Sequence, residues 1–128
     1  MFTIEQIDAI HARLGSASTL PEYVRALKTL GIERYDSYLA DGHSEYVGRG
    51  GHKVVSPAAH EVLAVAEISQ REAFLQHLRE HELGQTTYLE MSRGLARSGI
   101  EKWTVDTSEM TMAFYDKAGK EMLVEQIA

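Results

Sequence analysis

The feature that most constrains this chain is a segment that occurs twice within it. Residues 30–35 read LGIERY, and residues 98–103 read SGIEKW. When residues 19–55 are placed over residues 87–123 without a gap, eight of the 37 positions are identical, including the Gly-Ile-Glu runs that begin at Gly31 and Gly99. The identities fall where backbone geometry is special, so we predict an internal duplication.

Each copy predicts the same order of elements. A helix begins after Thr19, with Pro21 in its first turn, or after Thr87, whose partner Glu90 completes a capping box. A glycine then ends the helix in the left-handed conformation. Strands rich in aromatic and β-branched residues are expected to follow, at 32–40, 44–48 and 52–56 in the first copy and at 100–107, 110–116 and 120–127 in the second.

A further helix is expected before each copy. Thr3 and Gln6 indicate a capping box for a helix over residues 4–14, and Ser69 with Glu72 does the same for residues 70–83. Residues 56–68 have no counterpart, and periodicity leaves them as either an extra strand near 61–66 or a connecting segment. The prediction is a single α+β domain, residues 1–128, with helix-helix-β-β-β pseudo-repeats at about 3–56 and 69–127. Its helices pack on a mainly antiparallel sheet.

Charge and composition exclude several classes of partner. The net charge is −6, and the 13 Lys and Arg residues form no cluster, which argues against a nucleic acid and against an anionic membrane surface. The chain has no cysteine, no signal-peptide pattern and no long apolar run. We therefore expect a soluble cytoplasmic protein without a cofactor. A small molecule is the expected partner, and a homo-oligomer is left open.

Several stretches carry a family resemblance. The segments MFTIEQI, ADGHSEYVG, SGIEKWTVD and YDKAGKEMLVEQI are similar to the YbcV-like family of small bacterial proteins of unknown function, and the resemblance extends over essentially the whole chain. It implies an α+β single domain from bacteria or their prophages. Some members are labelled phage envelope protein. The resemblance supplies no catalytic residues.

The duplicated segment also gives the leading candidate site. Side chains alternate along a strand, so Glu33 shares a face with Tyr35, and Glu101 shares a face with Trp103. If the aromatic residues face inward and the copies are related by a two-fold axis, the two carboxylates are expected to converge in a shared cleft. Carboxylates beside aromatic rings have raised pKa values and suit acid–base work or a cationic ligand. The alternative is that both glutamates are solvated at strand ends.

Two other motifs are weaker candidates. HLREH, residues 77–81, fits the H-x-x-E-H pattern that places His77 and His81 on one helix to hold a metal, but a solvated helix flank is favoured. DGHSEYVGRGGHK, residues 41–53, brings Asp41 and His43 into a glycine-rich stretch. A structural turn is favoured there over anion or metal capture.

These observations leave three functions open. A non-enzymatic binding or regulatory module is favoured, with Glu33, Glu101, Tyr35, Trp103, Asp41 and His43 as candidate ligand-binding residues. A small enzyme that uses the paired carboxylates Glu33 and Glu101 comes second. A phage structural component comes third and depends only on the family label. Neither a nucleophile elbow nor a cysteine nucleophile is present, so no catalytic residue is assigned.

Overall fold

A computed structural model describes residues 2–15 and 17–127; Met1, Ser16 and Ala128 lie outside the described residues. The helices are α1 (Ile4–Leu14), α2 (Leu20–Leu30), α3 (Arg71–Glu82) and α4 (Tyr88–Arg97), with short 3₁₀ turns at Ala17–Thr19 and Arg49–Gly51. The strands are β1 (Ile32–Tyr38), β2 (Ser44–Gly48), β3 (Lys53–Val55), β4 (Ile100–Asp106), β5 (Thr111–Asp116) and β6 (Glu121–Gln126). The predicted α+β class is confirmed.

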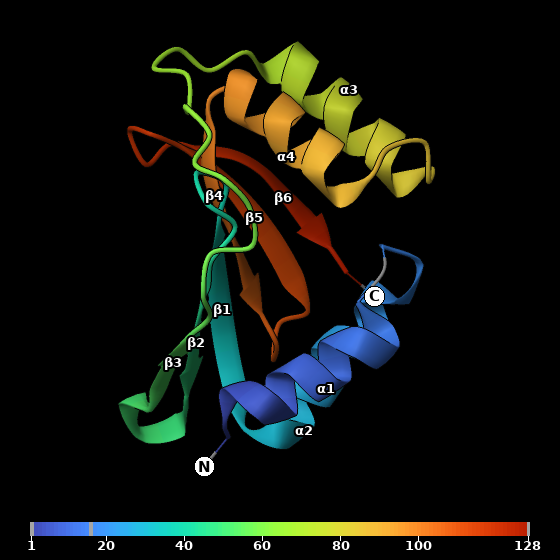
Figure 1. Cartoon of the computed structure of the whole chain (residues 1–128), viewed down its shortest axis with the longest axis vertical. Helices are drawn as coiled ribbons and strands as arrows, with labels where there is room; N and C mark the ends of the chain where they lie inside the picture. The colour runs from blue at the N-terminus through green and yellow to red at the C-terminus, as the bar shows by residue number, and fades with distance from the viewer. Residues whose placement is uncertain (1, 16, 128) are drawn as a thin grey trace.

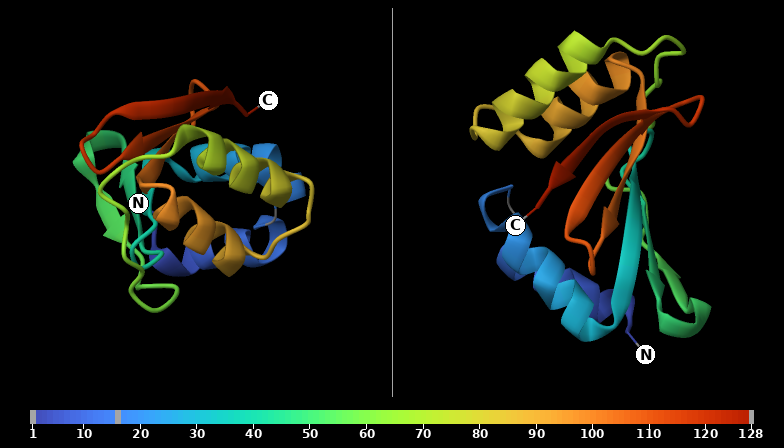
Figure 2. Two further views of the ribbon diagram at one scale, coloured as in Figure 1. Left: turned by 90° about the horizontal axis from the view of Figure 1, so that it is seen from above. Right: turned by 180° about the vertical axis from the view of Figure 1, so that it is seen from behind.

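The strands form one sheet with the order β3-β2-β1-β4-β5-β6, and every pairing in it is antiparallel. Strands β1 and β4 are therefore central neighbours, and they join the first three strands of the chain to the last three. Helices α1 and α2 form one pair and α3 and α4 another, and both pairs lie on the same face of the sheet (Figures 1 and 2). Among the residues that the structure describes, no helix lies over the opposite face.

Two of the three predicted capping boxes form, and both glycines predicted to end helices are left-handed. Thr3–Gln6 and Thr87–Glu90 both form complete capping boxes. Gly31 and Gly99 have φ values of 105° and 91°, as expected for glycines that end helices. The predicted Ser69–Glu72 box is wrong, because α3 begins one residue later with Gln70 as its N-cap, and the Gln70 N–H donates to the Ser98 carbonyl (2.8 Å).

The core lies between the helices and the sheet. Tyr35 on β1, Val105 on β4 and Leu39, which directly follows β1, are buried as predicted. Trp103 points the same way but is only half-buried, with its ring 6.1 Å from that of Phe114. The apolar stripes expected on α1 and α3 also pack inward; their members are Ile4, Ile7, Ile10, Leu14, Phe74, Leu75 and Leu78.

Residues 56–70 connect β3 to α3, and no strand or helix occurs within them. The segment is anchored through its backbone to the turn that follows β1 and to helix α4. The N–H of Leu63 donates to the Ala40 carbonyl (2.6 Å), and the N–H of Ala66 donates to the Ala96 carbonyl (2.9 Å). Of the two alternatives that the sequence left open, the connecting segment is the one observed.

Equivalent positions of the two copies meet at the sheet centre. Strands β1 and β4 have the same length, and in their antiparallel register Asp36 lies opposite Thr104, which is 68 positions later in the chain. This is the same offset that aligns the two sequence copies. A common origin of the copies stays a prediction. Among the residues described, no helix has the length and apolar character needed to span a membrane.

Candidate functional site

The structure does not bring Glu33 and Glu101 together. The N–H of Thr107 donates to the Glu33 carbonyl (3.0 Å), and the N–H of Leu39 donates to the Glu101 carbonyl (3.0 Å). The two glutamates therefore lie at opposite ends of the β1–β4 pair, six residues apart along a strand, which is about 20 Å. The expectation of a shared cleft is wrong.

A β-bulge in each strand explains why the predicted faces fail. In β1 the register passes from Ile32–Gly48 directly to Arg34–Val47, and in β4 it passes from Ile100–Asp116 to Lys102–Tyr115. The extra residue is the glutamate in both cases. Alternation is interrupted there, so Glu33 is exposed while Ile32 and Tyr35 are both buried.

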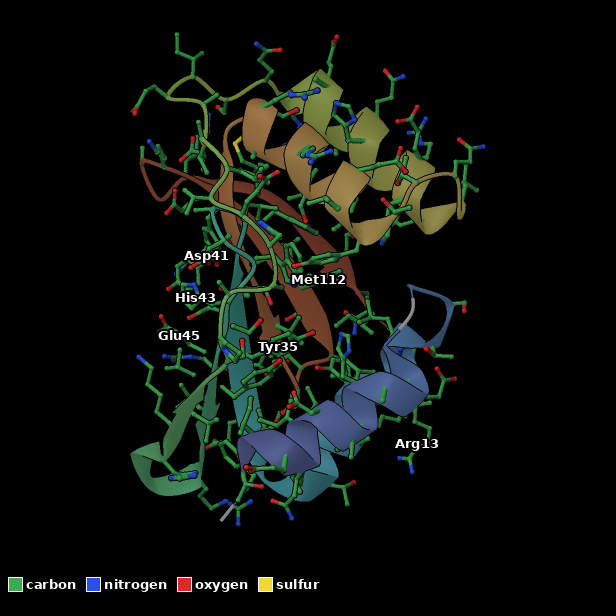
Figure 3. The ribbon with its side chains drawn as sticks, in the orientation of Figure 1. Arg13, Tyr35, Asp41, His43, Glu45 and Met112 are labelled. Atoms are coloured by element: carbon green, nitrogen blue, oxygen red, sulfur yellow. The ribbon has the colours of Figure 1, made fainter. Side chains whose placement is uncertain are left out.

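Tyr35 also lies away from any open site. Its ring packs against Tyr23 (6.2 Å between centroids) and Tyr46 (5.3 Å) beneath α1 and α2, and Figure 3 shows it on the helix side of the sheet. Burial, with a smaller contribution from Tyr46, raises the pKa of Tyr35 far above its ordinary value, so the phenol stays protonated. Tyr35 and the half-buried Trp103 contribute to the core.

The open face of the sheet has a shallow concavity of about 490 Å³. Three strands and the β5–β6 turn line it: Arg34, Asp36, Tyr38, Glu101, Lys102, Thr104, Tyr115, Asp116, Lys117 and Gly119. At its centre the Thr104 hydroxyl donates to Asp36 Oδ1 (2.5 Å), so the pair of equivalent positions noted above forms its base. Of the predicted residues, Glu101 is the one that lines this concavity.

The bulge in β4 places Glu101 and Lys102 side by side in the concavity, although consecutive strand residues ordinarily point to opposite faces. Among the described residues, neither side chain has an ion-pair partner. Lys102 Nζ instead lies 5.8 Å from the Tyr38 ring centroid and 5.7 Å from that of Tyr115. A carboxylate and an ammonium, neither of them in an ion pair within the described residues, thus lie close to aromatic rings in the concavity.

A charged network borders the concavity at its Tyr38 side. His43 Nδ1 lies 2.6 Å from Asp41 Oδ1, and His43 Nε2 lies 3.1 Å from Glu45 Oε2. Lys53 Nζ is 2.8 Å from the other oxygen of Glu45. The His43 ring is stacked on the Tyr38 ring, with 4.6 Å between centroids and 4° between planes. Figure 3 shows Asp41, His43 and Glu45 on the side of the sheet away from the helices.

The pKa values in the network favour its charged form. Burial works to lower the pKa of His43, but the hydrogen bonds with Asp41 and Glu45 outweigh it and raise the pKa above its ordinary value. The His43 backbone N–H and then its ring lower the pKa of Asp41, while Lys53 and then His43 lower that of Glu45. These interactions stabilise the imidazolium form of His43 between two carboxylates.

The predicted Asp41 and His43 are therefore brought together, in a hydrogen-bonded network rather than a simple turn. The glycine-rich stretch beyond them is a turn, as expected, with φ values of 77° at Gly50 and 84° at Gly51. Both nitrogens of His43 already face carboxylates, so neither is available to ligate a metal. No group of three or more potential metal ligands occurs among the described residues.

His77 and His81 have packing and hydrogen-bonding roles on α3. The imidazole of His77 lies against Gly94 of α4, where even one added carbon would come within 2.6 Å of the ring. This close approach is how α3 and α4 pack. His81 Nδ1 lies 3.2 Å from the Thr86 carbonyl oxygen in the loop that follows the helix.

A second cavity, of about 320 Å³, lies between the 3₁₀ turn before α2, the end of α3 and strand β6. Glu82 and Glu125 both line it. Burial, with the added repulsion of Glu82, raises the pKa of Glu125 to about 7. Sequence patterns gave no indication of this pair, since α3 and β6 are distant in the chain.

Tyr38, Lys102, Thr104 and Tyr115 were not among the predicted site residues. Alternation alone would have placed Lys102 on the outward face, but only knowledge of the bulge places Glu101 beside it. The strand order was also needed, because it sets β1 beside β4.

The fold and this face define an α+β protein whose antiparallel sheet is covered by helices on one side and carries a polar, aromatic concavity on the other. The chain belongs to the family described as protein of unknown function (DUF1398), whose family model matches residues 8–126. No curated protein matches the chain.

Proposed function

We propose that the chain is a non-enzymatic ligand-binding module whose open sheet face binds a small zwitterion with a flat apolar group. The observation that carries this proposal is the adjacent pair Glu101 and Lys102, which the bulge directs into the concavity without ion-pair partners among the described residues. Charged groups left unpaired at a concave surface are complementary to a ligand with the opposite charges.

Each group has a role in this proposal. Lys102 receives the ligand's carboxylate, Glu101 receives its ammonium, and the rings of Tyr38 and Tyr115 supply surface for the flat group. The lining as a whole carries three cationic residues (Arg34, Lys102, Lys117) and three acidic ones (Asp36, Glu101, Asp116), a formal charge of zero. That balance favours a zwitterion over an ion of either sign.

The other functions carry less support. An enzyme that uses Glu33 and Glu101 together needs both carboxylates at one reacting centre, and these two lie at opposite ends of the strand pair. A bacterial or prophage origin remains part of the proposal on the YbcV-like resemblance alone, and a cytoplasmic location remains part of it on the composition of the sequence. A role as a phage structural component has the same basis, and no feature of the open face favours it.

The proposal is tested by titration calorimetry with three probes that share a phenyl ring. L-phenylalanine carries both charges, 3-phenylpropionate only the carboxylate, and 2-phenylethylamine only the ammonium. We expect phenylalanine to bind most tightly. Lys102→Met is expected to weaken phenylalanine binding about tenfold or more, since a desolvated charge-assisted contact is lost, and Glu101→Gln to remove the preference for phenylalanine over 3-phenylpropionate.

Two matched controls come from the chain itself. Glu33 is the equivalent of Glu101 at the far end of the strand pair, and Lys28 is an exposed lysine on α2. Glu33→Gln and Lys28→Met are expected to leave all three affinities unchanged. Absence of saturable phenylalanine binding by the folded protein, or equal losses in Glu33→Gln and Glu101→Gln, would refute the proposal.

A further inference from the structure

The imidazole of His43 is held in a way that only its protonated form satisfies. Nδ1 faces Asp41 Oδ1 at 2.6 Å and Nε2 faces Glu45 Oε2 at 3.1 Å, so both nitrogens meet a carboxylate. An imidazolium donates from both nitrogens, whereas a neutral imidazole has a single N–H. In the neutral form one nitrogen lone pair would face a carboxylate oxygen, and one of the two hydrogen bonds would be lost.

The Tyr38 ring separates this histidine from the proposed ligand site. Strands β2 and β4 flank β1 on opposite sides. His43, just before β2, and Lys102, on β4, therefore approach the Tyr38 ring from opposite sides. The nearly parallel stack with His43 fixes the face that Tyr38 presents to Lys102 and to the concavity.

We propose that His43 is a positioning residue that makes ligand binding at the open sheet face depend on pH: the imidazolium holds Tyr38 beside Lys102, and loss of its proton weakens binding of the ligand's carboxylate. This inference depends on the proposed function of the same face. His43 itself does not touch the ligand, and its effect passes through the Tyr38 ring and through its charge.

The geometry indicates which bond breaks when the proton leaves. Asp41 Oδ1 is tied to the same residue a second time, because the His43 backbone N–H donates to it (3.0 Å). Glu45 is held in place by Lys53 at 2.8 Å. The shorter bond to Asp41 is therefore retained, and the ring turns away from Glu45 and out of its stack on Tyr38. The network also changes from a formal charge of zero to −1, which repels a carboxylate at Lys102.

The charged and titratable neighbours of His43 come from every element around it. They are Asp36 and Tyr38 on β1, Asp41 in the turn, Glu45 on β2, Lys53 on β3, His60 in the connecting segment and Lys102 on β4. His60 is the other histidine near Asp41, so its replacement is the matched control. The hydrogen bonds that raise the pKa of His43 set the direction of the effect. Binding is strongest below that pKa and weakens as pH rises through it.

The first experiment needs no ligand. Proton NMR of the full chain between about pH 5 and 8, the range in which histidines ordinarily change charge, follows the His43 imidazole and Tyr38 ring resonances. We expect the two to titrate with one midpoint. The pH-dependent shift of the Tyr38 ring resonances is expected to vanish in His43→Gln and to persist in His60→Gln. If the Tyr38 ring resonances do not shift as His43 loses its proton, the inference is overturned, whether or not the concavity binds a ligand.

The second experiment measures phenylalanine affinity over the same pH range. The wild-type affinity is expected to fall by about threefold or more across the His43 midpoint, the size expected when one charge close to the ligand is removed. The affinity of His43→Gln is expected to be flat, while His60→Gln keeps the wild-type slope. Binding that is tight at all pH values overturns the inference and leaves the proposed function intact. Absence of binding at every pH overturns the proposed function, and the inference with it.

Discussion

Replacement of the two helix-ending glycines by alanine gives a sharp test of the structure, because the two sites share a backbone conformation but differ in their surroundings. Both residues are left-handed, with φ of 105° at Gly31 and 91° at Gly99. A left-handed alanine costs about 1–2 kcal/mol. The lower entropy of alanine in the unfolded chain offsets about 0.4–1 kcal/mol of that. We therefore expect Gly31→Ala, whose added carbon meets no atom within 4 Å, to cost about 1 kcal/mol.

Gly99→Ala carries a further cost. Its added carbon would lie 2.7 Å from the Cα of Ser69 and 3.1 Å from the Ile68 carbonyl oxygen. Backbone atoms cannot rotate away as a side chain does, so overpacking adds about 1–3 kcal/mol. The total expected for Gly99→Ala is about 2–4 kcal/mol.

Urea denaturation followed by circular dichroism measures both variants against the wild type. The difference is expected in the midpoint, with the slope unchanged. Equal losses of stability in the two variants would show that residues 68–69 do not press against Gly99. A loss at Gly31 larger than at Gly99 would contradict the account of both sites.

Three further predictions concern stability. Between its ordinary pKa of 4.5 and about 7, Glu125 binds more protons in the folded than in the unfolded state, so the free energy of unfolding of the wild type falls as pH rises through this window. Glu125→Gln should remove that fall and raise the free energy of unfolding above pH 7 by about 1 kcal/mol, a figure discounted for solvent exposure. Urea titrations at several pH values measure both effects. Thr107→Val should lower the free energy of unfolding by about 1–2 kcal/mol in the same assay, because the buried hydroxyl donates to the Ile32 carbonyl at 2.7 Å. An unchanged free energy of unfolding would count against that hydrogen bond. Trp103→Ala should cost about 2 kcal/mol, less than for a fully buried indole, and iodide should quench the single tryptophan only in part.

The sequence was most informative where a local signal decides a local structure. The capping boxes at Thr3 and Thr87 and the left-handed glycines at 31 and 99 follow from short-range chemistry, so the sequence alone was sufficient for them. The Ser69–Glu72 box has the same pattern and does not form. There a tertiary contact decides the start of the helix, since Gln70 is hydrogen-bonded to Ser98, the residue that caps the end of α4.

The candidate site shows the same division. Asp41 and His43 are close in sequence, and the structure brings them together. The convergence of Glu33 and Glu101 depended on two properties that no local pattern reveals: unbroken alternation through each strand, and the register between β1 and β4. The bulges change the first, and the antiparallel register places the glutamates at opposite ends. Alternation alone places Lys102 on the outward face, but the bulge was needed to place Glu101 beside it and the strand order to place Tyr38 next to it.

The central pairing of β1 with β4 has a consequence for how the chain reaches its fold. Every other strand pairing joins neighbours in sequence through a short turn, whereas Asp36 and Thr104 are separated by 68 positions. Contacts of high sequence separation form against a larger loop-closure entropy and slow the folding reaction. Each group of three strands can assemble locally first, and the union of β1 with β4 should then limit the folding rate. Substitutions along that seam would slow refolding, while substitutions in the outer hairpins would mainly speed unfolding.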